Sequence, residues 1–270
     1  VEGEGEIYNI NPSDTNDLID TYSNASSSQL NDAVSSAKVA QKEWEKVGIE
    51  KRANILNDIG SEIIKQSKEI GTLLSREEGK TLPEGIGEVV RSGQQFQYYA
   101  ASALRQFGEN IASTREGVSV EMTREPVGVC GIISPWNFPI AIAAWKAAPA
   151  IAFGNAVVLK PASQTPASAI ALTKIISNQK DIPEGLFNLV LGGGGTIGHQ
   201  ISGHSGIDAI SFTGSVSVGQ TIYMEAAKTM KKMQLEMGSK NPLLVMDDAD
   251  LDIAVACATN GAYGGTGQKC

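Results

Sequence analysis

Cys270 stands in local sequence that suits a reactive thiol. It follows the glycine-rich run Gly264-Gly265-Thr266-Gly267-Gln268-Lys269. Such a loop leaves a cysteine accessible, and the adjacent Lys269 favours the thiolate, which is the nucleophilic form. Cys130 and Cys257 lie within apolar runs, where a buried and inert thiol is expected. Cys270 is therefore the candidate nucleophile.

Glu236 is the candidate general base. It lies between apolar neighbours in Leu235-Glu236-Met237-Gly238, where an expected strand ends. Partial burial raises the pKa of a carboxyl group, as proton abstraction near neutral pH requires. The alternative interpretation is an ion pair with Lys240.

Asn137 is the candidate oxyanion donor. It lies in Pro135-Trp136-Asn137-Phe138-Pro139, between an expected strand and an expected helix. Open α/β sheets bind ligands at the carboxyl ends of their strands, and a loop held by two prolines presents a fixed surface there. The side-chain amide of Asn137 can donate to a developing oxyanion. The alternative is a helix-capping Asn beside core aromatic residues.

Two glycine-containing turns could contact phosphate groups. Residues 193–198 match G-x-G-x-x-G behind a strand, but no acidic residue ends the next strand, so a simple flexible turn is equally favoured. Phe212-Thr213-Gly214-Ser215 joins another strand to a helix whose free amides favour an anion. An ordinary Ser cap explains this second turn as well.

Hydrophobic periodicity predicts the elements that position these residues. Residues 1–27 read as polar and turn-rich, with a turn at Asn11-Pro12-Ser13-Asp14. Helical spacing follows over 30–47, 55–63 and 83–107. Alternation over 111–125 predicts extended structure, either a projecting hairpin arm or an edge strand. Beyond it, strands (127–133, 156–160, 187–191, 209–212, 232–237, 243–246) alternate with helices (137–153, 165–178, 197–202, 216–228 and one from 251). This order predicts an α/β fold with a Rossmann-like parallel sheet, helices on both faces, and a helical N-terminal layer.

Composition narrows the class of protein. The 270 residues contain 22 Lys and Arg against 30 Asp and Glu, a net charge of −8, which argues against a nucleic-acid binder. No apolar run reaches the ~18 residues of a membrane helix. Three cysteines and two histidines without ligand spacing predict neither a metal site nor a disulfide framework. A reducing, cytoplasmic location without a signal peptide is the expectation.

The joint order of the motifs is more specific than any one of them. Across essentially the whole chain it resembles the aldehyde dehydrogenase superfamily, through Pro135–Pro139, Leu159–Ser163, Phe212–Ser215, Leu235–Gly238 and Gly267–Cys270. The stretches 209–216, 234–238 and 247–250 look most like the members that act on α-ketoglutaric semialdehyde.

The resemblance implies an NAD- or NADP-dependent oxidation of an aldehyde to a carboxylic acid through a thioester. Cys270 would attack the aldehyde, Asn137 and the Cys270 amide would stabilise the oxyanion, and Glu236 would activate the hydrolytic water. Phe138, Ile142 and Trp145 would line the aldehyde tunnel. The implied cofactor contacts are Ile133, Ser134, Pro135, Trp136, Lys160, Ser163, Gly193, Gly198, Phe212, Thr213, Gly214, Ser215, Val218, Met237 and Gly238.

Two positions depart from the family pattern. NAD-preferring members often carry Glu where this chain has Ser163, so we expect NADP to be accepted at least as well as NAD. Ser239 stands where a second glycine is common after Gly238.

The resemblance also implies a domain organisation. Residues 1–110 and 126–270 would form the NAD(P)-binding domain and 111–125 a bridging arm of a homodimer or homotetramer, with the catalytic domain beyond 270 absent. The substrate would be α-ketoglutaric semialdehyde, with succinate semialdehyde or another small aldehyde as alternatives. An inactive cofactor-binding fragment is the competing interpretation.

Overall fold

Five parallel strands form the central sheet of the computed structural model, which describes residues 3–105 and 108–269. Their order across the sheet is β7-β6-β5-β8-β9. The strands are β5 (Val129–Ile133), β6 (Ala156–Lys160), β7 (Phe187–Leu189), β8 (Ala209–Gly214) and β9 (Lys232–Met237). Every residue of β6 is buried, because helices cover both faces of the sheet, and this explains why the four residues before Lys160 are all apolar. The predicted parallel sheet is confirmed.

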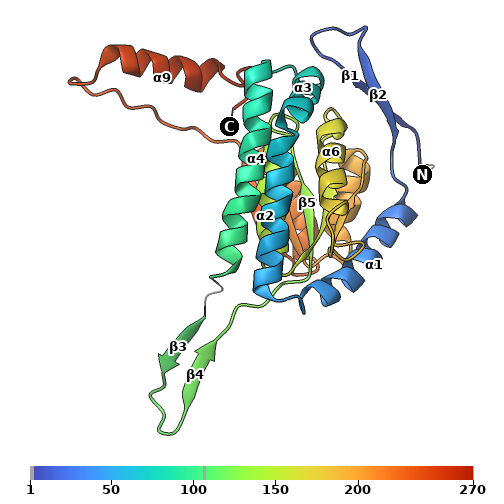
Figure 1. Ribbon diagram of the computed structural model, residues 1–270, viewed down its shortest axis with the longest axis vertical. Helices are drawn as coiled ribbons and strands as arrows, with labels where there is room; N and C mark the ends of the chain where they lie inside the picture. Colours follow the sequence, from blue (N-terminus) through green and yellow to red (C-terminus); the bar gives the residue numbers. More distant parts are fainter. Residues whose placement is uncertain (1–2, 106–107, 270) are drawn as a thin grey trace.

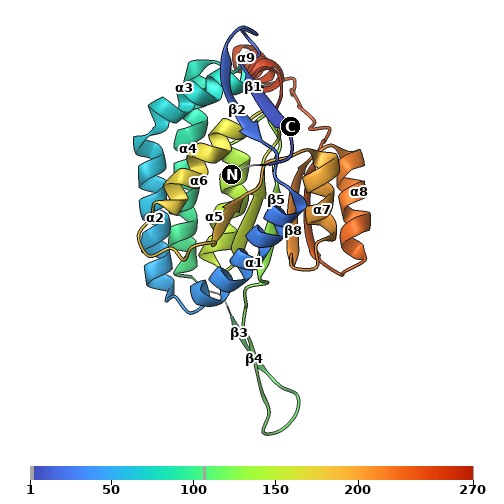
Figure 2. The same cartoon turned by 90° about the vertical axis from the view of Figure 1, so that its right-hand side faces the viewer.

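Helices pack on both faces of the sheet, as predicted (Figure 2). Right-handed crossovers place α5 (Ala141–Ala152) and α6 (Pro166–Ser177) on one face, and α7 (His199–Gly203) and α8 (Val216–Ala227) on the other. Helix α1 (Ser27–Trp44) lies beside α7, where Gln200 Nε2 donates to Ser27 Oγ at 2.9 Å.

Helices α2 (Ile49–Lys65), α3 (Ser67–Glu78) and α4 (Leu82–Ala103) form a helical layer outside α5 (Figure 2). The predicted layer also included the helix expected over 30–47, but α1 packs on the sheet beside α7 instead. Helices α2 and α4 approach closely because glycines face each other. A Cβ added to Gly60 would lie 2.5 Å from the Gly93 carbonyl oxygen. Helix α4 begins with a capping box between Thr81 and Glu84. Helix α3 was not predicted from the sequence, and the last two residues of the expected helix 83–107 lie outside the described residues.

The N-terminal segment is more regular than its composition indicates. Strands β1 (Glu6–Ile10) and β2 (Leu18–Ser23) form an antiparallel hairpin. The expected turn is present, with Asp14 N donating to Asn11 O at 3.2 Å. The sequence did not predict this hairpin, because one inward-facing position of β1 is polar. Asn9 at that position is buried and donates to Glu77 Oε2 at 2.9 Å.

The expected arm is a hairpin that projects from the layers (Figure 1). Strands β3 (Glu109–Ala112) and β4 (Ser119–Met122) pair antiparallel, and all their residues are exposed. Of the two interpretations of 111–125, the hairpin arm is confirmed and the edge strand is wrong, because the segment contains two short strands that pair with each other.

The C-terminal part corrects one prediction. Residues 243–246 are not a strand: they are irregular and exposed, because no strand of the described chain pairs with them. Helix α9 (Leu251–Tyr263) forms as expected, but it extends away from the sheet and none of its residues is buried (Figure 1).

Candidate active site at the carboxyl end of the sheet

The strand register brings the separate motifs to one edge of the sheet. Ile133, the last residue of β5, lies opposite Lys160 of β6 and Phe212 of β8. Phe212 in turn lies opposite Leu235, and Thr213 opposite Glu236 of β9. Because parallel strands end at the same edge, the loops that follow them form one surface.

Asn137 lies in the loop between β5 and α5 and contacts the glycine-rich loop that leads to Cys270. Its Nδ2 donates to the Gln268 carbonyl oxygen at 2.5 Å, a contact between residues 131 positions apart. Cys270 itself lies outside the described residues. The structure therefore brings the predicted oxyanion donor to the predicted nucleophile loop.

The start of α4 holds that glycine-rich loop in place. Gly265 N donates to Glu84 Oε1 at 2.7 Å. Three successive residues, 265–267, have φ angles of 62°, 56° and 70°, a left-handed path that favours glycine. The ammonium of Lys269 donates to Asn260 O at 2.9 Å, so it is turned to the end of α9.

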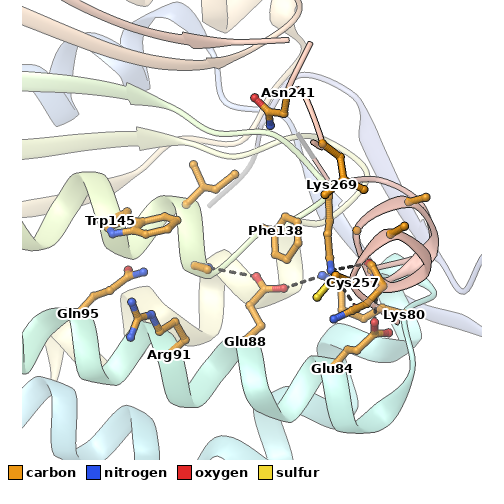
Figure 3. Close-up of a pocket in the computed structure, with 18 of the residues that line it drawn as sticks. Lys80, Glu84, Glu88, Arg91, Gln95, Phe138, Trp145, Asn241, Cys257 and Lys269 are labelled. Atoms are coloured by element: carbon orange, nitrogen blue, oxygen red, sulfur yellow. Dashed lines mark hydrogen bonds and ion pairs between the residues drawn. The ribbon is translucent and has the colours of Figure 1, made fainter. Parts of the chain in front are cut away.

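A buried ion cluster, which the sequence did not predict, holds the backbone of Asn137. Lys80 Nζ lies 2.7 Å from Glu88 Oε2, donates to the Asn137 carbonyl oxygen at 2.9 Å, and sits 4.1 Å from the centroid of the Phe138 ring (Figure 3). Glu88 Oε1 accepts from the amides of Ile140 and Ala141, both at 3.1 Å. One sequence signal was available: Glu88 falls on the buried stripe of α4, where a charged residue needs a partner.

Burial perturbs the carboxyl groups of this cluster. Desolvation raises the pKa of Glu88, and the Lys80 cation opposes that rise. Desolvation likewise raises the pKa of Glu78 to about 7, although Lys80 lies 3.7 Å away and lowers it. The cluster therefore holds two carboxyl groups in a place that water does not reach.

Glu236 differs from its prediction. It was expected to be partly buried, but it is exposed, because β9 is the edge strand of the sheet. The alternative ion pair with Lys240 is not formed among the described residues. Gln234 Nε2 instead donates to Glu236 Oε1 at 2.8 Å.

Lys146 is a second functional candidate that sequence reasoning did not single out. It shares a cavity of about 550 Å³ with Thr213 and Glu236. Its Nζ donates to Ser211 Oγ at 2.8 Å and to Gln234 Oε1 at 2.9 Å. Burial lowers the pKa of Lys146 to about 8, while the charge of Glu236 acts in the opposite direction. The cavity thus brings a carboxyl group together with a partly buried amine whose pKa lies below its ordinary value.

The residues predicted to bind the cofactor lie around two cavities. One of about 590 Å³ is lined by Ser163 and Gly193, and one of about 290 Å³ by Ile133, Gly198 and Val218. Lys160 Nζ donates to the Gly192 carbonyl oxygen at 3.1 Å, and Ser163 Oγ to the same atom at 3.3 Å. Burial lowers the pKa of Lys160 to about 8.

Ser134 provides a test of whether these residues fit a bound group. It lies just past β5, is 3% exposed, and its Oγ has no hydrogen-bond partner among the described residues. An unpaired buried hydroxyl is destabilising unless a ligand or water satisfies it. The site therefore fits a polar group placed at the end of β5.

Other predicted cofactor contacts are less accessible or less enclosed. Phe212 is buried in the core, under Gly214, where an added Cβ would lie 2.5 Å from the ring. Ser215 caps α8, accepting from Val218 N at 3.4 Å, which is the simpler role considered for it. Pro135 and Met237 are half-buried, whereas Trp136 and Gly238 are exposed.

The predicted tunnel residues Phe138, Ile142 and Trp145 line one cavity of about 1020 Å³ (Figure 3). Its other walls come from Lys80 and α4, from α9, from 241–243, and from Gly265 and Lys269 of the glycine-rich loop. Cys257 is exposed on α9 and lines this cavity, so its expected burial is wrong. The physical reason is that α9 has no buried face. Cys130 is half-buried in β5, and desolvation raises its pKa to about 12, in agreement with an inert thiol.

The described residues contain neither a cluster of metal ligands nor a membrane-spanning helix. No group of three or more His, Cys, Asp or Glu side chains is arranged to hold a metal ion. Within the same residues, no helix has the length and apolar character needed to cross a membrane.

Comparison with known proteins gives consistent matches over the whole chain. Residues 1–270 match the aldehyde dehydrogenase family. The alpha-ketoglutaric semialdehyde dehydrogenase of Bacillus subtilis is 42% identical over 98% of this chain and 54% of that protein. This chain spans about half the length of the curated relatives it matches.

Solved structures match equally well. An Escherichia coli NADP dependent enzyme superposes with a TM-score of 0.95 at 33% identity, over 98% of this chain and 55% of that one. A betaine aldehyde dehydrogenase from Staphylococcus aureus in complex with NAD+ superposes with a TM-score of 0.93 at 34% identity, over 97% and 53%.

Proposed function

The chain belongs to the aldehyde dehydrogenase family, and from this premise we propose that it provides the cofactor-binding part and the catalytic residues of an NAD(P)-dependent aldehyde dehydrogenase. The hydrogen bond from Asn137 to Gln268 carries the proposal. It places an amide donor beside the loop of Cys270, at the sheet edge where the predicted cofactor residues also lie.

The proposed reaction divides the work among three side chains. The Cys270 thiolate attacks the aldehyde carbon, a C–S bond forms, and the electron pair of the carbonyl moves to oxygen, where the Asn137 amide donates to it. A hydride leaves the same carbon, and a thioester remains. When bound, the nicotinamide supplies the acceptor for that hydride. Glu236 then takes a proton from water, which attacks the thioester and releases the acid and the thiolate.

Residues at the ends of β5 and β6 support the proposed cofactor site. Ser134 offers a hydroxyl that has no partner within 3–105 and 108–269, and Lys160 and Ser163 both donate to one carbonyl oxygen. We propose that NADP is accepted at least as well as NAD, because Ser163 puts no negative charge beside the 2′-phosphate. Glu4 and Glu6 line the same cavity from the N-terminal hairpin, and their charges oppose this preference.

The proposed substrate is α-ketoglutaric semialdehyde. Support comes from the name of the relative at 42% identity and from the motifs shared with such enzymes. Succinate semialdehyde or another small aldehyde is the alternative.

We also propose that the β3–β4 arm joins copies of the protein into a homodimer or homotetramer. Its side chains Ile111, Val118 and Val120 are 41–49% exposed and find no cover in the described chain. Removal of the arm should reduce the assembly to monomers in sedimentation velocity. An unchanged sedimentation coefficient per chain would contradict this role.

One comparison tests the proposed activity. Formation of reduced nicotinamide is measured with α-ketoglutaric semialdehyde, for this chain and for one that continues past Cys270 to the length of its relatives. The longer chain should turn over and Cys270→Ala should abolish turnover, whereas cofactor binding without turnover in both would favour the inactive fragment. Asn137→Ala should reduce kcat about 10²–10³-fold, the usual loss for one oxyanion donor.

A further inference from the structure

Gln95 is a buried amide in the wall of the 1020 Å³ cavity. It lies on α4 and is 4% exposed. Neither its Nε2 nor its Oε1 has a hydrogen-bond partner among the described residues. Buried side-chain amides in native proteins are nearly always paired, so an unpaired one that faces a cavity indicates a group that enters it. Figure 3 shows the amide directed into the cavity on the Trp145 side.

Arg91 lies one turn earlier on the same face of α4. Residues separated by four positions are neighbours on a helix surface, so the guanidinium and the amide line the same cavity together. In the part of the chain that the structure describes, Arg91 has neither an ion pair nor a side-chain hydrogen bond. It is exposed to the cavity and to solvent.

The other charged groups of this cavity are already engaged. Glu88 is held by Lys80 and by the amides that begin α5. Glu84 accepts from Gly265 N at 2.7 Å, and Lys269 donates to Asn260. Arg91 is therefore the charge that remains available to a ligand among the described residues. Because this charge is positive, the cavity favours an anionic ligand.

The cavity also reaches the reacting end of the proposed active site. Phe138, which adjoins Asn137, and Gly265, in the glycine-rich loop, both line it. An aldehyde bound with its carbonyl at Asn137 would extend along Phe138 and Trp145 towards α4. A second functional group at the far end of that molecule would meet Arg91 and Gln95.

We propose that Arg91 and Gln95 bind the carboxylate of an aldehyde substrate that carries one at the opposite end of a short chain. The guanidinium donates to the carboxylate oxygens, and Gln95 Nε2 adds a third donor. This assignment rests on the proposed function. It means that the enzyme prefers oxo acids to neutral aldehydes of the same length. A simple aliphatic aldehyde has no acceptor to offer Arg91, and it leaves Gln95 unpaired.

Paired substrates test the assignment in the chain that continues past Cys270. Values of kcat/KM are compared for glutaric semialdehyde and pentanal, which have equal carbon number and differ in the carboxylate. Arg91→Met should lower kcat/KM for the semialdehyde about 10- to 100-fold, mostly through KM, and change that for pentanal less than about threefold. Arg91→Lys should restore part of the loss, because it returns the charge without the planar fork.

A matched pair of glutamine variants tests the second donor. Gln95→Leu should lower kcat/KM for the semialdehyde about 3- to 10-fold and leave that for pentanal nearly unchanged. Gln94→Leu, on an exposed position of the same helix, should leave both substrates unchanged. Equal losses on both substrates in Arg91→Met, or no loss on either, would overturn the proposal while leaving the aldehyde dehydrogenase activity established.

A calorimetric titration with glutarate measures binding at the anion site without turnover. If no aldehyde is oxidised, the proposed function fails but this measurement still decides the anion site. Binding by the unaltered chain that is lost in Arg91→Met supports the assignment. Absence of binding by the unaltered chain, or equal binding by Arg91→Met, overturns it.

Discussion

Replacing Lys80 with Met should destabilise the protein strongly and in a pH-dependent manner. Lys80 Nζ lies 2.7 Å from Glu88 and 3.7 Å from Glu78, and the three side chains are 0–2% exposed. Removing one partner from such a buried cluster leaves uncompensated charge, which typically costs ~3–5 kcal/mol. The loss of the bond to the Asn137 carbonyl oxygen adds ~0.5–1.5 kcal/mol.

The pH dependence follows from the two carboxyl groups. Their folded pKa values are already raised by burial, that of Glu78 to about 7, and removal of the Lys80 cation raises both further. A carboxyl group with a raised folded pKa loses stability as pH rises through the interval between its unfolded and folded values. The destabilisation by Lys80→Met should therefore be small near pH 4.5 and increase towards pH 8.

Urea unfolding followed by tryptophan fluorescence, at a series of pH values, measures this difference. Lys42→Met is the matched control, because Lys42 forms a 3.3 Å ion pair with Glu45 on the surface and should cost at most ~1 kcal/mol at any pH. The double variant Lys80→Met/Glu88→Gln should recover part of the loss at pH 8, since it removes one unpaired charge. A loss below ~1 kcal/mol at pH 8, or one that does not vary with pH, would refute the reasoning.

Three further outcomes are expected. Ser163→Glu should shift the ratio of kcat/KM for NAD and NADP towards NAD by about tenfold or more, and an unmoved ratio would remove Ser163 from the cofactor site. Glu236→Gln should slow deacylation ~10²–10⁴-fold while the first-turnover burst persists in rapid-quench experiments; loss of the burst with Cys270 intact would show that Glu236 acts earlier. In the folded protein, iodoacetamide should modify the exposed Cys257 and spare the half-buried Cys130, whose pKa is raised to about 12; detection of labelled Cys130 by mass spectrometry would contradict an inert thiol.

The sequence predicted the sheet and its family because both depend on local patterns. Strands such as β6 are buried on both faces, so their apolar runs are continuous, and the alternation with helical periods defines an α/β fold. The motifs lie at strand ends, and parallel strands end at one edge, so order along the chain was enough to indicate a shared site. The hairpin β1–β2 was not predicted, because its inward-facing Asn9 is hydrogen-bonded to Glu77, 68 positions away in the chain.

Only the tertiary structure decided which side chains meet across long separations. Local patterns carry no information about a bond between residues 131 positions apart, such as Asn137 with Gln268, or about the Lys80 cluster beneath it. Glu236 is exposed on β9, the edge strand of the sheet, although its neighbours in sequence are apolar. Arg91 and Gln95 read as ordinary polar residues of a helix until α4 packs against α5. Their chemistry arises from that packing: among the residues that the structure describes, the buried Gln95 amide has no partner, and Arg91, which forms no ion pair there, lines the same cavity.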